Sequence, residues 1–324
     1  MPSLALTVAA ALALAGAGAA RTGAAGGPVP RGLAADTALA APQDSTRHYM
    51  IATAPAESLH VVMEGGGRPL VLIPGLFGSV FGFRKLLPLL TAAGYQVIIV
   101  EPLGFGTSGR PAHADYSLTA QSDRVAAVLD SLHIEHAIIV GHSIGGAIGF
   151  RLAIRHAAMV EGLVTIEGGP TERAATPAMG RAMRFAPLIK VFGGMRLVRH
   201  ELHHSLVAAS GDTTWITQTV IDGYTVGAAE NLGATLHAYR AMADSREPEP
   251  LAPHLGEITC PVRMILGEAP HDGGPPLAEL ELLRRSLRSF AIDAVPGAGH
   301  FVFEEQPEAV VASIERLRAE LPAR

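Results

Sequence analysis

Short apolar runs alternate with helical patterns along most of this chain. Eight runs rich in Val, Ile and Leu, bounded by Gly, Pro or polar residues, have the length of β-strands. We predict strands at residues 49–53, 59–64, 70–73, 96–100, 137–140, 163–166, 262–266 and 291–295. Most of the later runs are continuously apolar, as expected for strands that helices cover on both faces. The layout predicts an α/β fold with a mostly parallel eight-stranded sheet flanked by helices.

Two amphipathic stripes predict helices that pack against this sheet. Their apolar residues recur three or four positions apart, which places them on one helix face. The stripes are Val125, Val128, Leu129 and Leu132, and, after Pro307 at a helix start, Val310, Ile314, Leu317 and Leu321.

Residues 170–257 interrupt the alternation of strands and helices. Met, Phe, Leu and His are scattered there among Arg residues, without a recognisable strand. We predict a helical lid insertion after the sixth strand, carried by one domain that spans residues 48–324.

The N-terminal residues have a different composition. Residues 1–20 are apolar and end in small residues with A-x-A spacing, which predicts a signal peptide, and residues 21–47 predict a flexible linker of Ala, Gly and Pro. We expect an exported protein, periplasmic or secreted, if this leader is functional and a cytoplasmic one otherwise. No stable membrane association is expected after the leader is cleaved.

Composition excludes some classes of partner. Hydrophobic residues make up 48% of the chain and charged residues 17%, as in an ordinary globular protein. The net charge of −5 gives no basic field for nucleic acid, so we expect none as a partner. Cys260 is the only cysteine, which excludes an internal disulfide, and we interpret it as a small core residue.

The strongest chemical signal is Gly141-His142-Ser143-Ile144-Gly145. It follows the strand predicted at 137–140 and leads into a helical segment, which is the context of a G-x-S-x-G nucleophile elbow. The glycines remove side chains that would collide where the chain reverses. We predict that Ser143 is a nucleophile and that the Ile144 N–H, at the helix start, donates to an oxyanion.

Two further glycine-bearing loops follow predicted strands. Residues 73–78, Ile-Pro-Gly-Leu-Phe-Gly, follow the third strand, and by position the Leu76 N–H is the second oxyanion donor. Residues 295–301, Val-Pro-Gly-Ala-Gly-His-Phe, follow the last strand, from which His300 can reach Ser143 as its base. We expect activity to rise with pH as His300 becomes neutral, at about 6 to 7.

Other histidines fit this chemistry less well. His142 is interpreted as a packing or hydrogen-bonding residue beside the nucleophile. His200, His203 and His204 have only Glu201 as an acidic neighbour, which is weak evidence for zinc. We predict no metal site and no cofactor.

In their order along the chain, these motifs resemble the α/β-hydrolase fold family. Residues 101–108, Glu-Pro-Leu-Gly-Phe-Gly-Thr-Ser, are similar to that family's D-x-x-G-x-G-x-S loop. Gly-His-Ser-Ile-Gly-Gly resembles its elbow and Gly-Ala-Gly-His-Phe its histidine loop. The resemblance covers about half of the chain and implies an α/β-hydrolase fold with a catalytic triad. Pro74 departs from the pattern, since the family often has His at that position.

The acid of the implied triad has two candidates. The family usually places an Asp three residues after the glycine that ends the seventh strand, but Pro270 occupies that position here. Asp272 lies two residues later. Glu167 ends the sixth strand before two glycines, and certain haloalkane dehalogenases are similar in carrying their acid there. We favour Glu167, since the strand exit and glycines aim it at the site.

A serine nucleophile suits acyl transfer through an acyl-enzyme. In the α/β-hydrolase fold family that the chain resembles, dehalogenases and epoxide hydrolases use an Asp nucleophile instead of a serine. We expect hydrolysis of carboxylic esters with a small to medium hydrophobic group, because Trp215, Tyr224 and the apolar insertion suggest an apolar pocket roof. The alternatives are C–C bond hydrolysis, lactone hydrolysis or perhydrolysis on the same triad, or a non-catalytic ligand-binding protein of this fold. The oligomeric state is left open.

Overall fold

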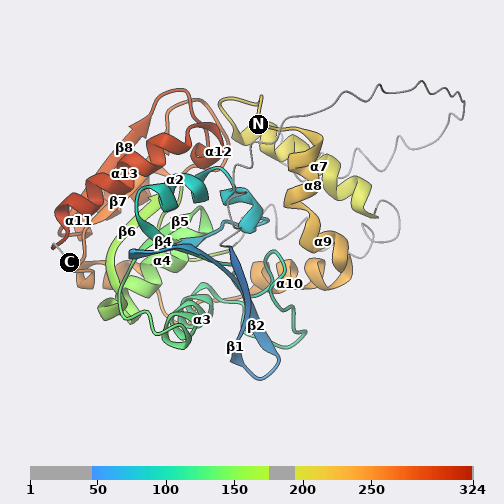
Figure 1. The fold of residues 1–324 in the computed structure, drawn as a ribbon, viewed down its shortest axis with the longest axis horizontal. Coiled ribbons are helices and arrows are strands. Elements are labelled where there is room, and N and C mark those ends of the chain that lie inside the picture. Colours follow the sequence, from blue (N-terminus) through green and yellow to red (C-terminus); the bar gives the residue numbers. More distant parts are fainter. Residues whose placement is uncertain (1–45, 175–193, 323–324) are drawn as a thin grey trace, which may run out of the picture.

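A single eight-stranded sheet organises the protein (Figure 1). The computed structural model describes residues 46–174 and 194–322, so the predicted signal peptide and most of the predicted linker lie outside the described residues. The strand order is β1-β2-β4-β3-β5-β6-β7-β8. The strands are β1 (Arg47–Ala54), β2 (Glu57–Gly65), β3 (Arg68–Ile73), β4 (Tyr95–Val100), β5 (Ala137–His142), β6 (Val160–Ile166), β7 (Val262–Gly267) and β8 (Phe290–Val295). All eight predicted strands are confirmed, and each is one to three residues longer than the pattern indicated.

The pairing of the strands brings several loops to one edge. β1 and β2, and β2 and β4, are antiparallel, and every other pair is parallel. Ile73 of β3 pairs with Gly141 of β5, and His142 pairs with Ile166 of β6. The carboxyl ends of β3, β5 and β6 therefore lie side by side at the same edge of the sheet. The prediction of a mostly parallel sheet is confirmed.

Two helical layers cover the sheet, because alternate strand residues face opposite sides. In β3, for example, Val71 and Ile73 join one buried cluster and Leu70 and Leu72 the other. The first layer contains α3 (Leu118–Ser131), α4 (Ile144–Arg155) and α11 (Leu277–Ser286), and the second α2 (Leu86–Ala92), α12 (Val302–Glu305) and α13 (Pro307–Glu320). Short 3₁₀ turns lie at η1 (Val80–Phe83) and η2 (Ala157–Met159).

The two predicted stripes lie in these helices. Val125, Val128 and Leu129 of α3, and Val310, Ile314 and Leu317 of α13, are fully buried. The last residue of each stripe, Leu132 and Leu321, is the C-cap of its helix. Cys260 packs partly against the core, and burial raises the pKa of its thiol to about 11. This agrees with a packing role for Cys260.

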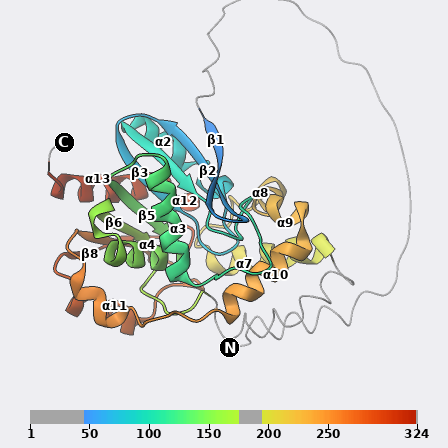
Figure 2. The ribbon, with the colours of Figure 1, turned by 90° about the horizontal axis from the view of Figure 1, so that it is seen from below.

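The chain between β6 and β7 forms the insertion. Its described part contains α7 (Gly194–Ala209), α8 (Gln218–Tyr224), α9 (Val226–Glu230), α10 (Leu232–Asp244) and η3 (Ala252–Glu257), and residues 175–193 lie outside the described residues. Figures 1 and 2 both show α7, α8 and α9 gathered on one side, away from α11 and α13. Within residues 46–174 and 194–322, no helix is long and apolar enough to span a membrane.

A buried ion pair fastens the end of this insertion to the first helical layer. The Glu247 carboxylate follows α10 and accepts hydrogen bonds from the N–H groups of Leu118 and Thr119, at 2.8 and 3.0 Å, at the start of α3. It also pairs with the Arg151 guanidinium of α4 at 3.1 Å. Both charged side chains are at least 95% buried. Removing the carboxylate leaves a buried cation with a weaker set of partners.

We predict that Glu247→Ala lowers the free energy of unfolding by about 3 kcal/mol, because among the described residues Arg151 then keeps the half-exposed Glu172 as its one acidic partner. The control is Glu249→Ala, whose exposed carboxylate pairs with the exposed Arg155 and should cost under about 1 kcal/mol. Urea denaturation measures both values. Equal losses of unfolding free energy in the two variants would contradict the proposed stabilising role of the Glu247–Arg151 ion pair.

Candidate active site

Ser143 occupies a strained turn between β5 and α4. Its backbone has φ 52° and ψ −121°, a region that costs a non-glycine residue about 1–3 kcal/mol. Gly145 permits the turn, since a Cβ there would lie 2.3 Å from the Ile73 carbonyl oxygen. The Ser143 N–H donates to the Ile166 carbonyl at 2.8 Å. Its side chain does not cap α4, so the hydroxyl is available at the sheet edge.

The loop after β3 lies against this turn. A Cβ on Gly75 would lie 3.0 Å from the Ser143 Cβ, and the Gly78 N–H closes the loop on the Gly75 carbonyl at 2.8 Å. The Leu76 N–H finds no acceptor among the described residues. Ile144 is the first residue of α4, where backbone N–H groups have no intrahelical partner. These two N–H groups belong to the segments next to Ser143, the loop after β3 and the first turn of α4.

A buried carboxylate connects this region to the loop after β4. Glu101 is 2% exposed, and its Oε1 accepts the Val80 N–H at 2.8 Å. Its Oε2 accepts the Thr107 N–H at 2.7 Å and lies 3.0 Å from His60 Nδ1. The sequence identified residues 101–108 as a motif but missed this connection. The signal available was a carboxylate that directly follows a buried strand.

His300 lies in the loop after β8, against His142, the residue that precedes Ser143. Its ring packs edge-on to His142 with centroids 4.7 Å apart, and His142 Nε2 lies 3.1 Å from the His300 carbonyl oxygen. Burial, reinforced by the nearby His271, lowers the pKa of His300 to about 4. The imidazole is therefore neutral at ordinary pH and able to accept a proton.

The insertion helps to hold the His300 loop. Carbonyl groups of Ala208 and Ala209, at the end of α7, accept the N–H groups of Asp272 at 3.1 Å and His300 at 2.7 Å. The Glu305 carboxylate accepts the Gly299 N–H at 3.1 Å and the N–H groups of residues 211 and 212 at 2.9 and 2.8 Å. The position of His300 therefore depends on contacts from both sides of its loop.

Of the two candidate acids, Glu167 lies near His300. Its Oε2 is 4.0 Å from His300 Nδ1, and its Oε1 accepts the Gly267 N–H at 2.5 Å. Burial raises the pKa of Glu167 above its ordinary value, against the opposing effect of the Gly267 hydrogen bond. Asp272 is exposed, and within the described chain its carboxylate forms no hydrogen bond or ion pair. The neighbouring Gly273 instead packs on the His300 ring.

His271 is a site residue that the sequence interpretation missed. Its Nε2 lies 3.2 Å from Glu167 Oε2, and its Nδ1 lies 2.7 Å from the Ala269 carbonyl oxygen. Glu167 therefore faces two histidines, His271 and His300. The sequence feature that could have identified His271 is its position directly before Asp272 in the loop after β7.

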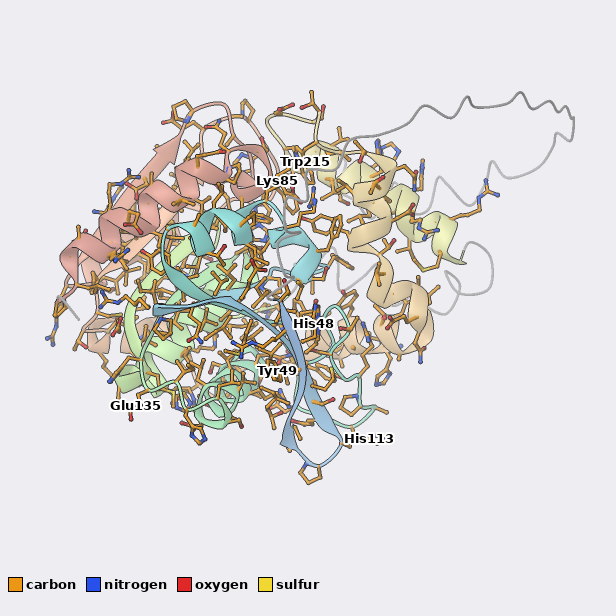
Figure 3. The ribbon with its side chains drawn as sticks, viewed as in Figure 1. His48, Tyr49, Lys85, His113, Glu135 and Trp215 are labelled. Atoms are coloured by element: carbon orange, nitrogen blue, oxygen red, sulfur yellow. The ribbon has the colours of Figure 1, made fainter. Side chains whose placement is uncertain are left out.

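Aromatic side chains of the insertion pack against the loop after β3 and the His300 loop. Phe301, beside His300, contacts Trp215, which Figure 3 labels, with ring centroids 5.6 Å apart. Phe77, in the loop after β3, packs edge-on to Tyr239 of α10 at 4.6 Å. The insertion therefore gives the site an apolar border.

The histidine cluster identified in the sequence lies on α7. His200 and His203 line a hollow with Arg196 and Arg199 of the same helix. Those guanidinium groups repel a metal cation, in keeping with the weak zinc signal of the sequence.

Comparisons with known proteins agree with this architecture. A family model for the alpha/beta hydrolase fold matches residues 68–204. The 2-hydroxymuconate semialdehyde hydrolase of Pseudomonas sp. (strain CF600) is 41% identical over 129 residues, which cover 38% of this chain and 44% of that relative. The AB hydrolase superfamily protein YisY of Bacillus subtilis (strain 168) is 26% identical over 81% of this chain and 96% of its own length.

A solved structure shares the fold over nearly its full length. The epoxide hydrolase CorEH superposes with a TM-score of 0.70 at 21% identity, covering 85% of this chain and 99% of that one. At that identity the likeness concerns the fold. Since sheet order, motif order and relatives all agree, the chain has the α/β-hydrolase fold, and the proteins it is similar to include hydrolases.

Proposed function

We propose that the protein hydrolyses carboxylic esters through an acyl-enzyme on Ser143, with His300 as the base and Glu167 as the triad acid. The observation that carries this proposal is the buried, neutral His300 ring, which lies 4.0 Å from the Glu167 carboxylate and packs on His142, the residue before Ser143. A hydrolase that used Asp as the nucleophile would need a carboxylate where Ser143 stands.

The proposed mechanism assigns one task to each group. His300 takes the Ser143 proton as Oγ attacks the ester carbonyl, and Glu167 stabilises the resulting imidazolium. The Leu76 and Ile144 N–H groups stabilise the oxyanion of the tetrahedral intermediate. His300 then returns the proton to the leaving alcohol, and water releases the acyl group by the same steps.

The expected substrate carries a small to medium hydrophobic group. Trp215, Val220, Ile221 and Tyr224 of the insertion form an apolar cluster with Leu206. Phe301 packs partly against this cluster and stands beside His300. We propose that the insertion serves as the lid that borders the substrate pocket.

The second candidate is C–C bond hydrolysis on the same residues. It is favoured by the 41% identity to a protein named 2-hydroxymuconate semialdehyde hydrolase. A semialdehyde of this name contains no ester bond, so its hydrolysis must break a carbon–carbon bond. Comparing turnover of p-nitrophenyl esters with turnover of that semialdehyde separates the two candidates.

We predict that Ser143→Ala lowers kcat on p-nitrophenyl esters by about a thousandfold or more while the fold persists, because the attacking oxygen is removed. The control is Ser131→Ala, whose exposed hydroxyl bonds only its own helix and should leave the rate unchanged. Steady-state kinetics and circular dichroism measure both effects. A wild-type rate in Ser143→Ala would refute the nucleophile assignment.

Glu167→Gln should lower kcat by about a thousandfold with KM little changed, because the amide keeps the shape but loses the charge that stabilises the imidazolium. Asp272→Asn is the matched comparison and should change the rate by only about twofold to threefold, since its carboxylate is solvent-exposed. The reverse pattern would reassign the acid to Asp272.

The pH profile should differ from the sequence-based expectation of a rise at about 6 to 7. Because burial lowers the pKa of His300 to about 4, the base stays neutral through the mildly acidic range. We predict that kcat/KM is constant down to about pH 5 and falls as the pH drops through about 4. Circular dichroism at each pH controls for unfolding. A midpoint at about 6.5 would contradict the buried, neutral base.

A further inference from the structure

Glu167, His271 and His300 form a buried cluster of three potential metal ligands. Glu167 Oε2 lies 3.2 Å from His271 Nε2 and 4.0 Å from His300 Nδ1, and all three atoms lie within 4.8 Å of one another. The side chains of Glu167, His271 and His300 are 1%, 8% and 10% exposed. Serine hydrolysis uses two of these residues and has no task for His271.

His271 directs its Nε2 atom toward Glu167. The Ala269 carbonyl oxygen, 2.7 Å from Nδ1, can only accept, so Nδ1 carries the proton. Nε2 of His271 faces the Glu167 carboxylate at 3.2 Å. An imidazole nitrogen and a carboxylate oxygen at this distance share a proton when no metal is bound, and a metal ion that takes both atoms as ligands replaces that proton.

The Nδ1 atom of His300 is the third potential metal ligand. This atom is buried and has no hydrogen-bond partner among the described residues. An unpaired buried polar atom is costly, and this one belongs to a side chain nine-tenths buried that borders the same carboxylate. Nδ1 of His300 and Nε2 of His271 therefore converge on Glu167.

We propose that Glu167, His271 and His300 bind one divalent transition-metal ion of the zinc type, and that this ion inhibits the hydrolase. Two imidazoles and one carboxylate suit Zn²⁺, Co²⁺ or Ni²⁺, whereas Mg²⁺ and Ca²⁺ prefer oxygen ligands.

The cluster must contract to bind such an ion. Ligand atoms of a tetrahedral zinc site lie about 3.3 Å apart, so the 3.2 Å contact already fits and the 4.0 Å contact must shorten by under about 1 Å. The ligand atoms of the two histidines lie within 4.8 Å of each other and must approach by up to about 1.5 Å. The hydrogen bond from His271 Nδ1 to a backbone carbonyl is the outer contact that usually orients a metal-binding histidine.

Inhibition follows from which atoms the ion occupies. The proposed triad needs Glu167 Oε2 to stabilise His300 through Nδ1, and the metal coordinates both atoms. The inhibition rests on the proposed function, but binding of the ion does not. Direct metal binding and enzyme turnover therefore test separate parts of the proposal.

The binding experiment uses chelator-treated full-length protein titrated with Zn²⁺ by calorimetry and with Co²⁺ by visible absorption. Ser143→Ala should bind one ion per chain as tightly as the wild type, because it keeps all three ligands. His271→Asn should bind on the order of a hundredfold more weakly. The control is His254→Asn, which changes a histidine on η3 that pairs with Glu257. Equal affinity in His271→Asn and wild type, or no binding to either, would overturn the site.

The activity experiment measures wild-type ester turnover with Zn²⁺, with Mg²⁺ and after a chelator is added. We expect Zn²⁺ to inhibit, the chelator to restore the rate, and Mg²⁺ to have no effect. Binding with no ester turnover in any condition would refute the proposed function and leave the metal site standing. Full turnover in the presence of bound Zn²⁺ would overturn the inhibition.

Discussion

The parallel pairing of β5 with β3 and β6 is the constraint on which the candidate site depends. It ends three neighbouring strands at one edge, so that the chain leaving each strand must turn within reach of the others. Ser143 is held between these turns because its N–H bonds the last carbonyl of β6 and Gly145 packs on the last carbonyl of β3. The strained φ of Ser143 persists because the sheet on both sides fixes the turn.

Burial then determines the chemistry available at this edge. The His300 ring is removed from water by His142, Phe301 and the loop after β7, so its neutral form is favoured. The end of α7 bonds the His300 backbone, which couples the insertion to the proposed base. An insertion proposed to border the substrate is therefore also linked to the proposed base.

The sequence predicted most of the fold because strand length, apolar character and helical stripes are local properties. The elbow, the loop after β3 and the His300 loop could be identified since each follows a strand at a recognisable spacing. The choice between Glu167 and Asp272 could not be made so firmly, because it depends on how the loop after β7 folds back. In the structure, that loop brings Gly273 and His271 to His300 and leaves the Asp272 carboxylate in solvent. The roles of His271, Glu101 and Glu247 were missed because each contacts residues far away in the sequence.

The most direct test of the central claim, that Ser143 is an activated nucleophile, is covalent labelling with a fluorophosphonate followed by mass spectrometry of the digested protein. The account predicts one adduct per chain on the peptide that contains Ser143, with a much slower reaction in His300→Ala, because the base no longer takes the serine proton. A folded wild-type protein that stays unlabelled, or an adduct on another residue, would contradict it.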